Sequence, residues 1–245
     1  MNDETGIKRR FGKSAQTYDK YAEIQNSVAQ SLNNLIADTS PTSILEIGCG
    51  TGLLSTQIVK KFPSANFTFT DLSANMLKIA EKKLKAQFPD NQSQFHFQTF
   101  NPETNQLEKK YDLILSSMAI HWFRDVEKSI QSLQAALNEK GVFYYSTIGQ
   151  DCFSEWTSTL TNLNYPNGLR IPVNLPGIVK SETIKIPYGS AQNFLKNLKL
   201  TGAHSPKPGY IPLSPKQLKT AMKKLEEDYQ ASLSWEIVYG KCQQN

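Results

Sequence analysis

Three glycines at alternate positions follow an acidic residue in the segment Ile44–Gly52, which reads Ile-Leu-Glu-Ile-Gly-Cys-Gly-Thr-Gly. Gly48, Gly50 and Gly52 carry no β-carbon, so their backbone can adopt positive φ values and a ligand can approach it closely. The apolar run before the glycines predicts a strand, and Leu53–Lys61 after them predicts a helix. A strand, a bare loop and a helix N-terminus together suit a nucleotide-like ligand. The alternative is a plain strand–helix turn.

A second acidic residue, Asp71, closes the next predicted strand, 19 positions after Gly52. A carboxylate at that place can accept two hydrogen bonds from the ribose hydroxyls of an adenosine group. Leu72 follows it and is expected on one face of the adenine ring. The alternative for Asp71 is capping of the helix that starts near Ala74. Because Ser73 is also able to cap that helix, the two roles are compatible.

The spacing of the glycines distinguishes between cofactors. Dinucleotide enzymes usually carry Gly-x-Gly-x-x-Gly, whereas this chain has Gly-x-Gly-x-Gly behind Glu46. This resembles the first motif of class I S-adenosylmethionine-dependent methyltransferases, which implies S-adenosyl-L-methionine as the cofactor. In that family the position of Glu46 lies beside the sulfonium and amino-acid end of the cofactor, where a carboxylate attracts the ammonium group. The alternative, a buried acid paired inside the fold, is costly without a partner.

One stretch departs from the family pattern. Many relatives carry a Gly-Asp-x-Glu-like run after the third strand, where the aspartate bonds the adenine amino group. The matching residues here are Gln98–Asn101, so Thr99 and Phe100 are expected beside the adenine. The Thr99 hydroxyl or a backbone carbonyl then meets the amino group in place of a charged acceptor.

The loop after the fourth predicted strand, residues 116–123, passes beneath the methionine portion of the cofactor in the family. The resemblance implies that Ser116 offers its backbone carbonyl to the ammonium group and that His121 and Trp122 line the methyl-transfer centre. For His121, packing against its aromatic neighbours is an equal alternative. Methyl transfer mainly needs alignment, and positioning contributes roughly 7–11 kcal/mol. A carboxylate acceptor is ionised at neutral pH and needs no general base, whereas a phenol or an amine does.

The composition is that of a cytoplasmic enzyme. The 245 residues suffice for one α/β domain, and no apolar run approaches the roughly 18 residues of a membrane span. Met1–Phe11 is polar and charged, unlike a signal peptide. Cys49, Cys152 and Cys242 have neither disulfide nor metal-ligand spacing, so we expect reduced thiols and no bound metal. The net charge of +5 is compatible with an acidic protein or a nucleic acid as partner.

Short β-rich runs alternate with helical stretches from Ser43 onward, which predicts an α/β fold with a doubly wound sheet. The expected strands are Ser43–Ile47, Asn66–Thr70, Gln94–Gln98, Tyr111–Ser116, Gly141–Thr147, Thr183–Pro187 and Leu233–Tyr239. The expected helices are Leu53–Lys61, Ala74–Ala86, Val126–Leu137 and Ala191–Leu200. The resemblance implies a seven-stranded, Rossmann-like methyltransferase sheet whose last strand is antiparallel. We expect one domain over residues 1–245, with a helical N-terminal arm over residues 1–40. Residues 149–180 are expected to form a cap inserted over the site; the alternative is a flexible connection without a function of its own.

Three segments narrow the resemblance. Arg10–Ala22 with Gln25, Ala119–Trp122 and Phe194–Ala203 resemble parts of malonyl-acyl-carrier-protein O-methyltransferase from biotin synthesis. That family methylates the free carboxylate of a malonyl thioester held on acyl carrier protein. The resemblance therefore implies the same reaction here, with acyl carrier protein as the partner.

Tyr18 and Tyr21 lie three positions apart and share a face if their segment is helical. We expect them to cover the cofactor and shape the acceptor pocket, with simple packing as the alternative. Four cations are candidates to hold a malonyl carboxylate or to contact an acidic carrier protein: Arg9, Arg10, Arg170 and Lys199. Arginine gives the better bidentate match to a carboxylate, although each of the four is equally compatible with an ordinary surface charge.

Two alternatives keep the cofactor. The first is a methyltransferase that acts on another small carboxylate or on a quinone-type phenol, and the second is a binding module without transfer activity. An RNA methyltransferase is disfavoured, because the chain has no Asn-Pro-Pro-Tyr-like motif and no concentrated basic tract with interleaved aromatics.

Overall fold

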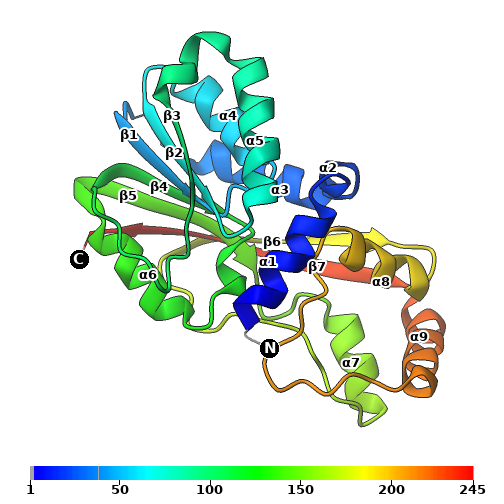
Figure 1. Ribbon diagram of the computed structural model, residues 1–245. Coiled ribbons are helices and arrows are strands. Elements are labelled where there is room, and N and C mark those ends of the chain that lie inside the picture. The colour runs from blue at the N-terminus through cyan, green and yellow to red at the C-terminus, as the bar shows by residue number, and fades with distance from the viewer. Residues whose placement is uncertain (1–2, 38, 245) are drawn as a thin grey trace.

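Seven strands form one mixed sheet in the order β3-β2-β1-β4-β5-β7-β6 (Figure 1). The strands are β1 (Ser43–Ile47), β2 (Asn66–Asp71), β3 (Phe95–Thr99), β4 (Tyr111–Ser117), β5 (Leu137–Ile148), β6 (Ile178–Pro187) and β7 (Ser232–Gln243). β1 to β5 pair in parallel, whereas β7 runs antiparallel to both β5 and β6. The computed structural model describes residues 3–37 and 39–244. It confirms the predicted doubly wound fold and its antiparallel last strand.

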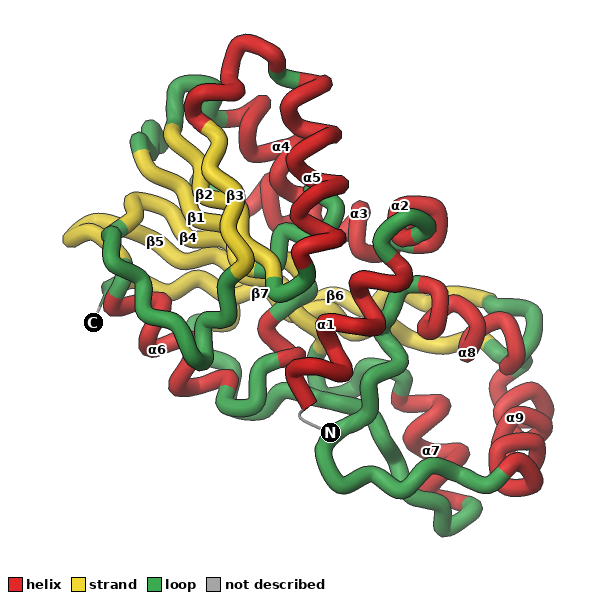
Figure 2. Tube along the Cα trace, viewed as in Figure 1, coloured by secondary structure: helices red, strands yellow, loops and turns green. Residues whose placement is uncertain are grey.

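Helices cover both faces of this sheet (Figure 2). They are α1 (Asp3–Ser14), α2 (Tyr18–Tyr21), α3 (Glu23–Leu35), α4 (Leu53–Lys61), α5 (Ala74–Gln87), α6 (Val126–Ala135), α7 (Ser154–Asn162), α8 (Ala191–Leu200) and α9 (Pro215–Tyr229), with short 3₁₀ turns η1 (Pro89–Gln94) and η2 (Ile120–Trp122). Side chains that accept hydrogen bonds from the first turn begin several of them. Ser73 caps α5, Asp125 caps α6, and Ser214 with Gln217 forms a capping box at α9.

Two hydrophobic clusters hold the layers together, one on each face of the sheet. Because side chains alternate along a strand, Ile44 of β1 lies in the larger cluster while its neighbour Leu45 lies in the smaller one. The larger cluster joins the sheet to α3, α4 and α5 and continues to α7, α8 and α9, whereas the smaller one joins it to α6. Within the described residues, α1 contributes to neither cluster.

The segment predicted as a cap insertion contains regular structure that the sequence reading missed. α7 lies inside it, and Trp156 and Leu160 of that helix are buried in the larger cluster. β6 begins at Ile178, within the predicted range, so residues 149–153 and 163–177 are the parts without helix or strand. Its role as a cap stays a prediction.

The N-terminal arm is helical, as predicted. α1 and α2 lie at the edge of the sheet where the parallel strands end, and α3 packs against α4 (Figure 1). Met1, Asn2, Asp38 and Asn245, which the predicted domain includes, lie outside the described residues. In the described ranges, every helix is too short or too polar to cross a membrane.

Candidate active site

Two neighbouring cavities lie at the carboxyl ends of β1, β2 and β4. The larger encloses about 860 Å³, part of it open to solvent, and the smaller about 320 Å³. Tyr18, Gly48, Gly50 and Ser117 line both, so the two form one continuous site. In a parallel sheet with right-handed crossovers, this edge is where ligands bind. The size also suits a drug-sized or nucleoside-sized ligand.

The glycine loop leaves the floor of this site without side chains. Gly48 has a φ of +70°, and a β-carbon built there would lie 2.5 Å from Cβ of Ala119. Gly50 has a φ of +57°, and a β-carbon there would meet no atom within 4 Å. Gly52 starts α4 with a φ of +84° but is absent from the lining of either cavity within the described residues. Gly52 is therefore positioned to shape the turn into α4, and not to line the space for the cofactor.

These two glycines predict different outcomes on substitution. In Gly48→Ala the added methyl group collides with the side chain of Ala119, so the glycine loop has to shift. This should lower the free energy of unfolding by about 1–3 kcal/mol. Gly50→Ala costs only the strain of a positive φ, about 1–2 kcal/mol, but places a methyl group where a ligand approaches. Urea unfolding and calorimetric titration with cofactor measure the two effects. A Gly50→Ala protein that is folded and binds the cofactor as tightly as the unchanged chain contradicts this view of the loop.

Asp71 stands at the end of β2 and orders the loops on both sides of it. Its Oδ2 accepts a hydrogen bond from the backbone N–H of Gly50 at 2.9 Å, and its Oδ1 accepts one from Ser73 N–H at 2.7 Å. Ser73 in turn caps α5 through Met76 N–H, which leaves the ribose contact predicted for Asp71 as a prediction. Burial raises the pKa of Asp71 to about 6, against the lowering effect of these two hydrogen bonds. At neutral pH the carboxylate is charged and keeps lone pairs for a ligand.

Glu46 is buried in the wall of the smaller cavity, where it is 2% exposed. Its Oε2 accepts a hydrogen bond from the Ser55 hydroxyl at 2.6 Å. Burial, with a contribution from the charge of Asp71, raises its pKa to about 7. Two carboxylates that repel each other inside one cavity favour a cationic ligand. Gln25 and Thr51 line the same cavity and were not foreseen from the sequence.

The raised pKa values of Glu46 and Asp71 make cofactor binding depend on pH. A cation stabilises both carboxylates in the ionised form, so binding near pH 6.5 should release protons and affinity should rise from pH 5.5 to 7.5. Without ligand the sign is opposite for stability: ionisation of these groups removes stability as pH rises through about 6 to 7. Calorimetry in two buffers of different ionisation enthalpy counts the protons. Glu46→Gln should release fewer, and an unchanged count would contradict the assignment.

The adenine side of the larger cavity differs in part from the prediction. Leu72 and Phe100 line it, as expected, and Met76 joins them, whereas Thr99 is exposed and is not among its described lining residues. Asn101 lines it instead, with its Oδ1 accepting a hydrogen bond from Glu103 N–H at 2.9 Å.

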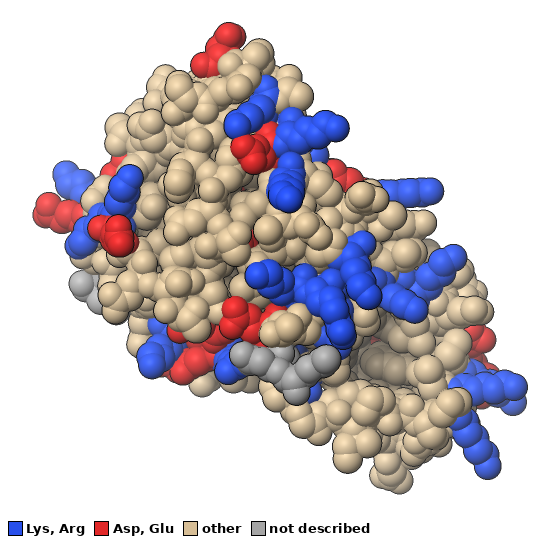
Figure 3. Space-filling model, in the orientation of Figure 1, with Lys and Arg blue, Asp and Glu red and all other residues tan. Residues whose placement is uncertain are grey.

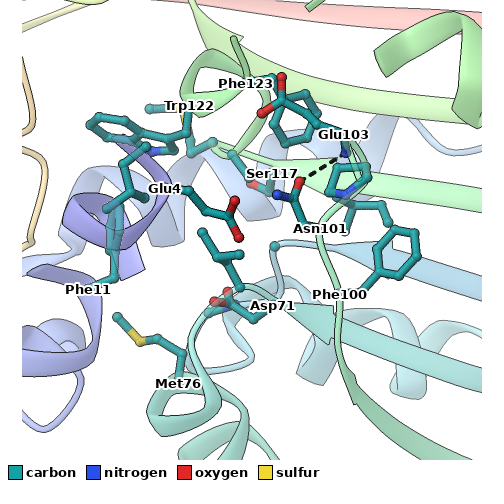
Figure 4. A pocket seen from close by; sticks show the side chains of 18 of the residues that line it. Glu4, Phe11, Asp71, Met76, Phe100, Asn101, Glu103, Ser117, Trp122 and Phe123 are labelled. Carbon is teal, nitrogen blue, oxygen red and sulfur yellow. Dashed lines mark hydrogen bonds between the residues drawn. The ribbon is translucent and has the colours of Figure 1, made fainter. Parts of the chain in front are cut away.

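Figure 4 shows Asn101 turned toward the same space as Asp71 and Ser117. The side chain that lines the cavity is thus that of Asn101, two positions after Thr99, and the contact predicted between Thr99 and the adenine amino group stays a prediction. The sequence signal that remained was Asn101 itself, the first polar residue after a buried phenylalanine.

α1 closes the larger cavity from outside, which the sequence reading did not foresee. Glu4, Ile7 and Phe11 line it from this helix, one turn apart, and Figure 4 shows Glu4 and Phe11 facing the cavity. The Phe11 ring meets the Trp122 ring edge to face at 5.4 Å between centroids. The spacing of Ile7 and Phe11 in an otherwise polar helix was the available signal.

The two tyrosines of α2 have different surroundings. Tyr18 lines both cavities, whereas Tyr21 lines neither within the described residues. Burial raises the pKa of Tyr18 well above its ordinary value, and the charges of Asp71 and Asp19 add to the effect. Its phenol therefore stays protonated and is able to donate a hydrogen bond to a ligand. The Tyr21 carbonyl accepts a bond from Asn197 of α8 at 3.5 Å, which ties the two helices together.

The loop after β4 reaches the cavity through other residues than some of those predicted. Trp122 lines the larger cavity, but His121 is buried behind it, with its Nδ1 3.1 Å from the Thr147 hydroxyl. Burial and the nearby charge of Arg170 lower the pKa of His121 to about 3, so the ring is neutral. This favours the packing alternative for His121.

Ser116 also points away from the site. It is fully buried, and its hydroxyl donates to the Ile47 carbonyl at 3.0 Å. The next residue, Ser117, lines both cavities. The role predicted for the Ser116 carbonyl stays a prediction.

The four candidate cations lie in two places. Arg10 donates to the Ser205 hydroxyl at 2.8 Å, and Arg9 and Lys199 are exposed on α1 and α8. Arg170 belongs to the loop before β6, and its guanidinium carbon lies 5.9 Å from the centroid of the Trp122 ring. Its Nε donates to the Pro206 carbonyl at 3.1 Å. Arg170 thus approaches the larger cavity, whereas the other three belong to a separate surface.

Comparison with known proteins agrees with this geometry. Residues 45–143 match the family described as methyltransferase domain. Malonyl-[acyl-carrier protein] O-methyltransferase 2 from Ilyobacter polytropus is 31% identical over 243 residues, which cover 94% of this chain and 90% of that protein. The YcgJ protein from Bacillus subtilis has a TM-score of 0.63 at 15% identity, covering 89% of this chain and 99% of that chain. The phosphoethanolamine N-methyltransferase 2 of Haemonchus contortus, solved with S-adenosylhomocysteine, has a TM-score of 0.57 at 14% identity, covering 100% of this chain and 61% of that chain.

The site fits the cofactor of such enzymes. The open direction above Gly50 leaves room for a ligand on bare backbone, Asp71 retains acceptors for hydroxyls, and apolar side chains from Leu72 and Phe100 suit a flat ring. Glu46 supplies negative charge for a cationic end. S-adenosyl-L-methionine has each of these parts and is the cofactor of this enzyme. With similarity along nearly its whole length, the chain belongs to the malonyl-[acyl-carrier protein] O-methyltransferase family.

Proposed function

We propose that this enzyme methylates the free carboxylate of a malonyl group held as a thioester on acyl carrier protein, giving the methyl ester used in biotin synthesis. The similarity along 94% of the chain to a relative of that name supports the substrate class. The lining of the cavity supports the type of acceptor. The reaction joins a carboxylate oxygen to the activated methyl of S-adenosyl-L-methionine and leaves the sulfur as an uncharged thioether.

Different residues bind different parts of the cofactor. Asp71 accepts hydrogen bonds from ribose hydroxyls, and Glu46 attracts the ammonium group and offsets the positive sulfur. Leu72 and Phe100 enclose the adenine. Because Phe11 and Trp122 close the cavity edge to face, they exclude water from the space where the acceptor enters.

The observation that carries the proposal is the lack of a suitable base in the site. In the part of the chain that the structure describes, neither cavity is lined by a histidine or a lysine. Tyr18 keeps its proton and His121 lies behind Trp122, so neither accepts a proton from the acceptor. Burial raises the pKa values of Glu46 and Asp71 to about 7 and 6, but in this proposal both carboxylates are occupied by the cofactor, Glu46 by its ammonium group and Asp71 by its ribose. An acceptor that is already ionised needs none.

The acceptor carboxylate is placed on the Trp122 side of the larger cavity. Arg124 lines the cavity there, and the Arg170 guanidinium carbon lies 5.9 Å from the centroid of the Trp122 ring. Guanidinium groups bind carboxylates better than ammonium groups do, through paired hydrogen bonds. Since Arg170 comes from the predicted cap over 149–180, this contact also gives that segment a function beside the site.

Incubation of the full chain with methyl-labelled S-adenosyl-L-methionine and malonyl-loaded carrier protein tests the proposal. A gain of one methyl on the malonyl moiety, measured by mass analysis of the acyl group, is the expected result. Unloaded carrier protein and free malonate serve as controls and should remain unlabelled. If free small acids are labelled at the same rate, the acceptor is a small carboxylate in general and the carrier protein is not required. Cofactor binding without any transfer would favour a binding module.

A further inference from the structure

Lysine and arginine side chains gather on one surface next to the cavity. Figure 3 shows them over α1 and α8, in the middle of the face that is seen. We call this surface the basic face; its exposed cations are Lys8, Arg9, Lys13, Lys196 and Lys199. Neither residues 5–14 of α1 nor any position of α8 is acidic. The basic face is therefore a cluster of one sign.

Contacts join α1 to the end of α8 and to the turn that follows it. The Ser14 hydroxyl at the end of α1 donates to the Lys199 carbonyl at 3.5 Å, and Arg10 donates to Ser205 just beyond α8. Gly202 lies so close to α1 that an added β-carbon would be 3.0 Å from the Phe11 ring. The pKa of His204 is lowered by burial and then by the charge of Arg10, with a smaller effect from Lys199. Arg10 and Lys199 therefore both lie near His204, where α1 meets the turn after α8.

The basic face differs from the other lysine-rich surfaces in its lack of compensating acids. On α5 and α9, lysines pair with carboxylates: Lys83 with Asp19, Lys85 with Glu81 and Lys224 with Asp228. No ion pair forms at the five cations of the basic face with any acid in the described ranges. Uncompensated charge of one sign attracts a partner of the opposite sign and speeds its association.

The position of the basic face relates it to the active site. α1 presents Glu4, Ile7 and Phe11 to the larger cavity on one side and Arg9 and Lys13 to solvent on the other. A molecule bound on the basic face is thus separated from the cavity by the thickness of one helix. That is the place where a protein must sit if it delivers a tethered group to the Trp122 side of the cavity.

We propose that the basic face of α1 and α8 is the docking surface for the acidic carrier protein. This inference rests on the proposed function and adds the place where its partner binds. A nucleic acid is the less suitable occupant, because the described exposed residues of α1 and α8 include no aromatic side chain to stack on bases.

A pair of matched double variants tests the docking surface. Lys13→Glu with Lys196→Glu reverses two charges on the basic face, and Lys216→Glu with Lys219→Glu reverses two exposed charges on α9. Both lower the net charge equally. The first should reduce kcat/KM for malonyl-loaded carrier protein about tenfold or more, by an amount that shrinks as salt increases. The second should leave it unchanged.

Two further measurements exclude damage to the cofactor site as the cause of a reduced kcat/KM. The first double variant should bind S-adenosyl-L-methionine as tightly as the unchanged enzyme and unfold at the same urea concentration. A loss of cofactor affinity, an equal loss in the α9 variant, or full activity of the first variant on carrier protein would each overturn the docking surface.

Direct binding of malonyl-loaded carrier protein, followed by fluorescence anisotropy, separates this inference from the proposed function. Binding that the Lys13→Glu, Lys196→Glu variant loses supports the docking surface even if the unchanged enzyme transfers no methyl. Methyl transfer by the unchanged enzyme with equal carrier binding by both proteins overturns the surface and keeps the function. Binding of labelled single-stranded RNA that only this variant loses, with carrier binding unaffected, assigns the surface to nucleic acid.

Discussion

Replacement of Asp71 by alanine should weaken binding of S-adenosyl-L-methionine by roughly 10- to 150-fold. The carboxylate supplies charge-assisted hydrogen bonds worth about 1.5–3 kcal/mol, and each 1.4 kcal/mol is a factor of about ten in affinity. The same substitution removes the hydrogen-bond acceptor of Gly50 N–H and that of Ser73 N–H. The glycine loop that contacts the ligand is then less firmly held in place. Calorimetric titration measures the change directly.

Asp112 offers a matched control for Asp71. Its carboxylate also orders backbone, accepting bonds from Thr42 N–H at 2.8 Å and Ser43 N–H at 3.0 Å, but at the opposite edge of the sheet. Asp112→Ala should lower stability and leave cofactor affinity unchanged. Equal loss of affinity in both variants would show that the effect of Asp71 is general loosening of the fold. Full affinity in a folded Asp71→Ala protein would remove Asp71 from the site.

Phe194→Ala should lower the free energy of unfolding by about 3–5 kcal/mol, the usual cost of removing a fully buried aromatic ring. Phe194 is completely buried in α8. Its ring centroid lies 5.1 Å from that of Phe153, 6.2 Å from that of Trp156 and 5.3 Å from that of Tyr188. The substitution therefore leaves a cavity among α7, α8 and the strand that precedes α8. Urea unfolding measures the loss.

Leu195 is the control for this prediction, because it is adjacent on α8 and only half-buried. Leu195→Ala should cost clearly less than Phe194→Ala. If the two costs are equal, α8 is not anchored by the aromatic cluster as described. Because α8 carries Lys196 and Lys199, its anchoring also fixes the position of the basic face.

The parts of the fold that were predicted within a residue are those whose local pattern agrees with their tertiary setting. β1, α4 and α8 have the predicted limits, since a continuous apolar run or an amphipathic stripe identifies each. α9 was missed although its apolar residues recur at helical spacing, because the stretch is rich in charged residues and only Ala221 and Leu225 of its described residues are buried.

The site follows a similar rule. Asp71 and the glycine loop were found because one short stretch of chain sets each of them. Phe11 was missed because its place depends on how α1 lies across the sheet edge. The side chain of Ser117 was not predicted to line the site, since the family resemblance indicated only the backbone carbonyl of Ser116 and does not fix which side chain at the strand end faces the cavity.

The attachment of α1 has a consequence for how the site is entered. This helix closes the cavity yet belongs to neither hydrophobic cluster. Its contacts beyond the cavity are largely hydrogen bonds, such as those from Arg10 to Ser205 and from Asn75 to the Gly12 carbonyl. An element with little apolar packing is the first to detach in local unfolding. Cofactor exchange can thus proceed by release of one helix, while the glycine loop and Asp71, which the sheet holds, remain in place.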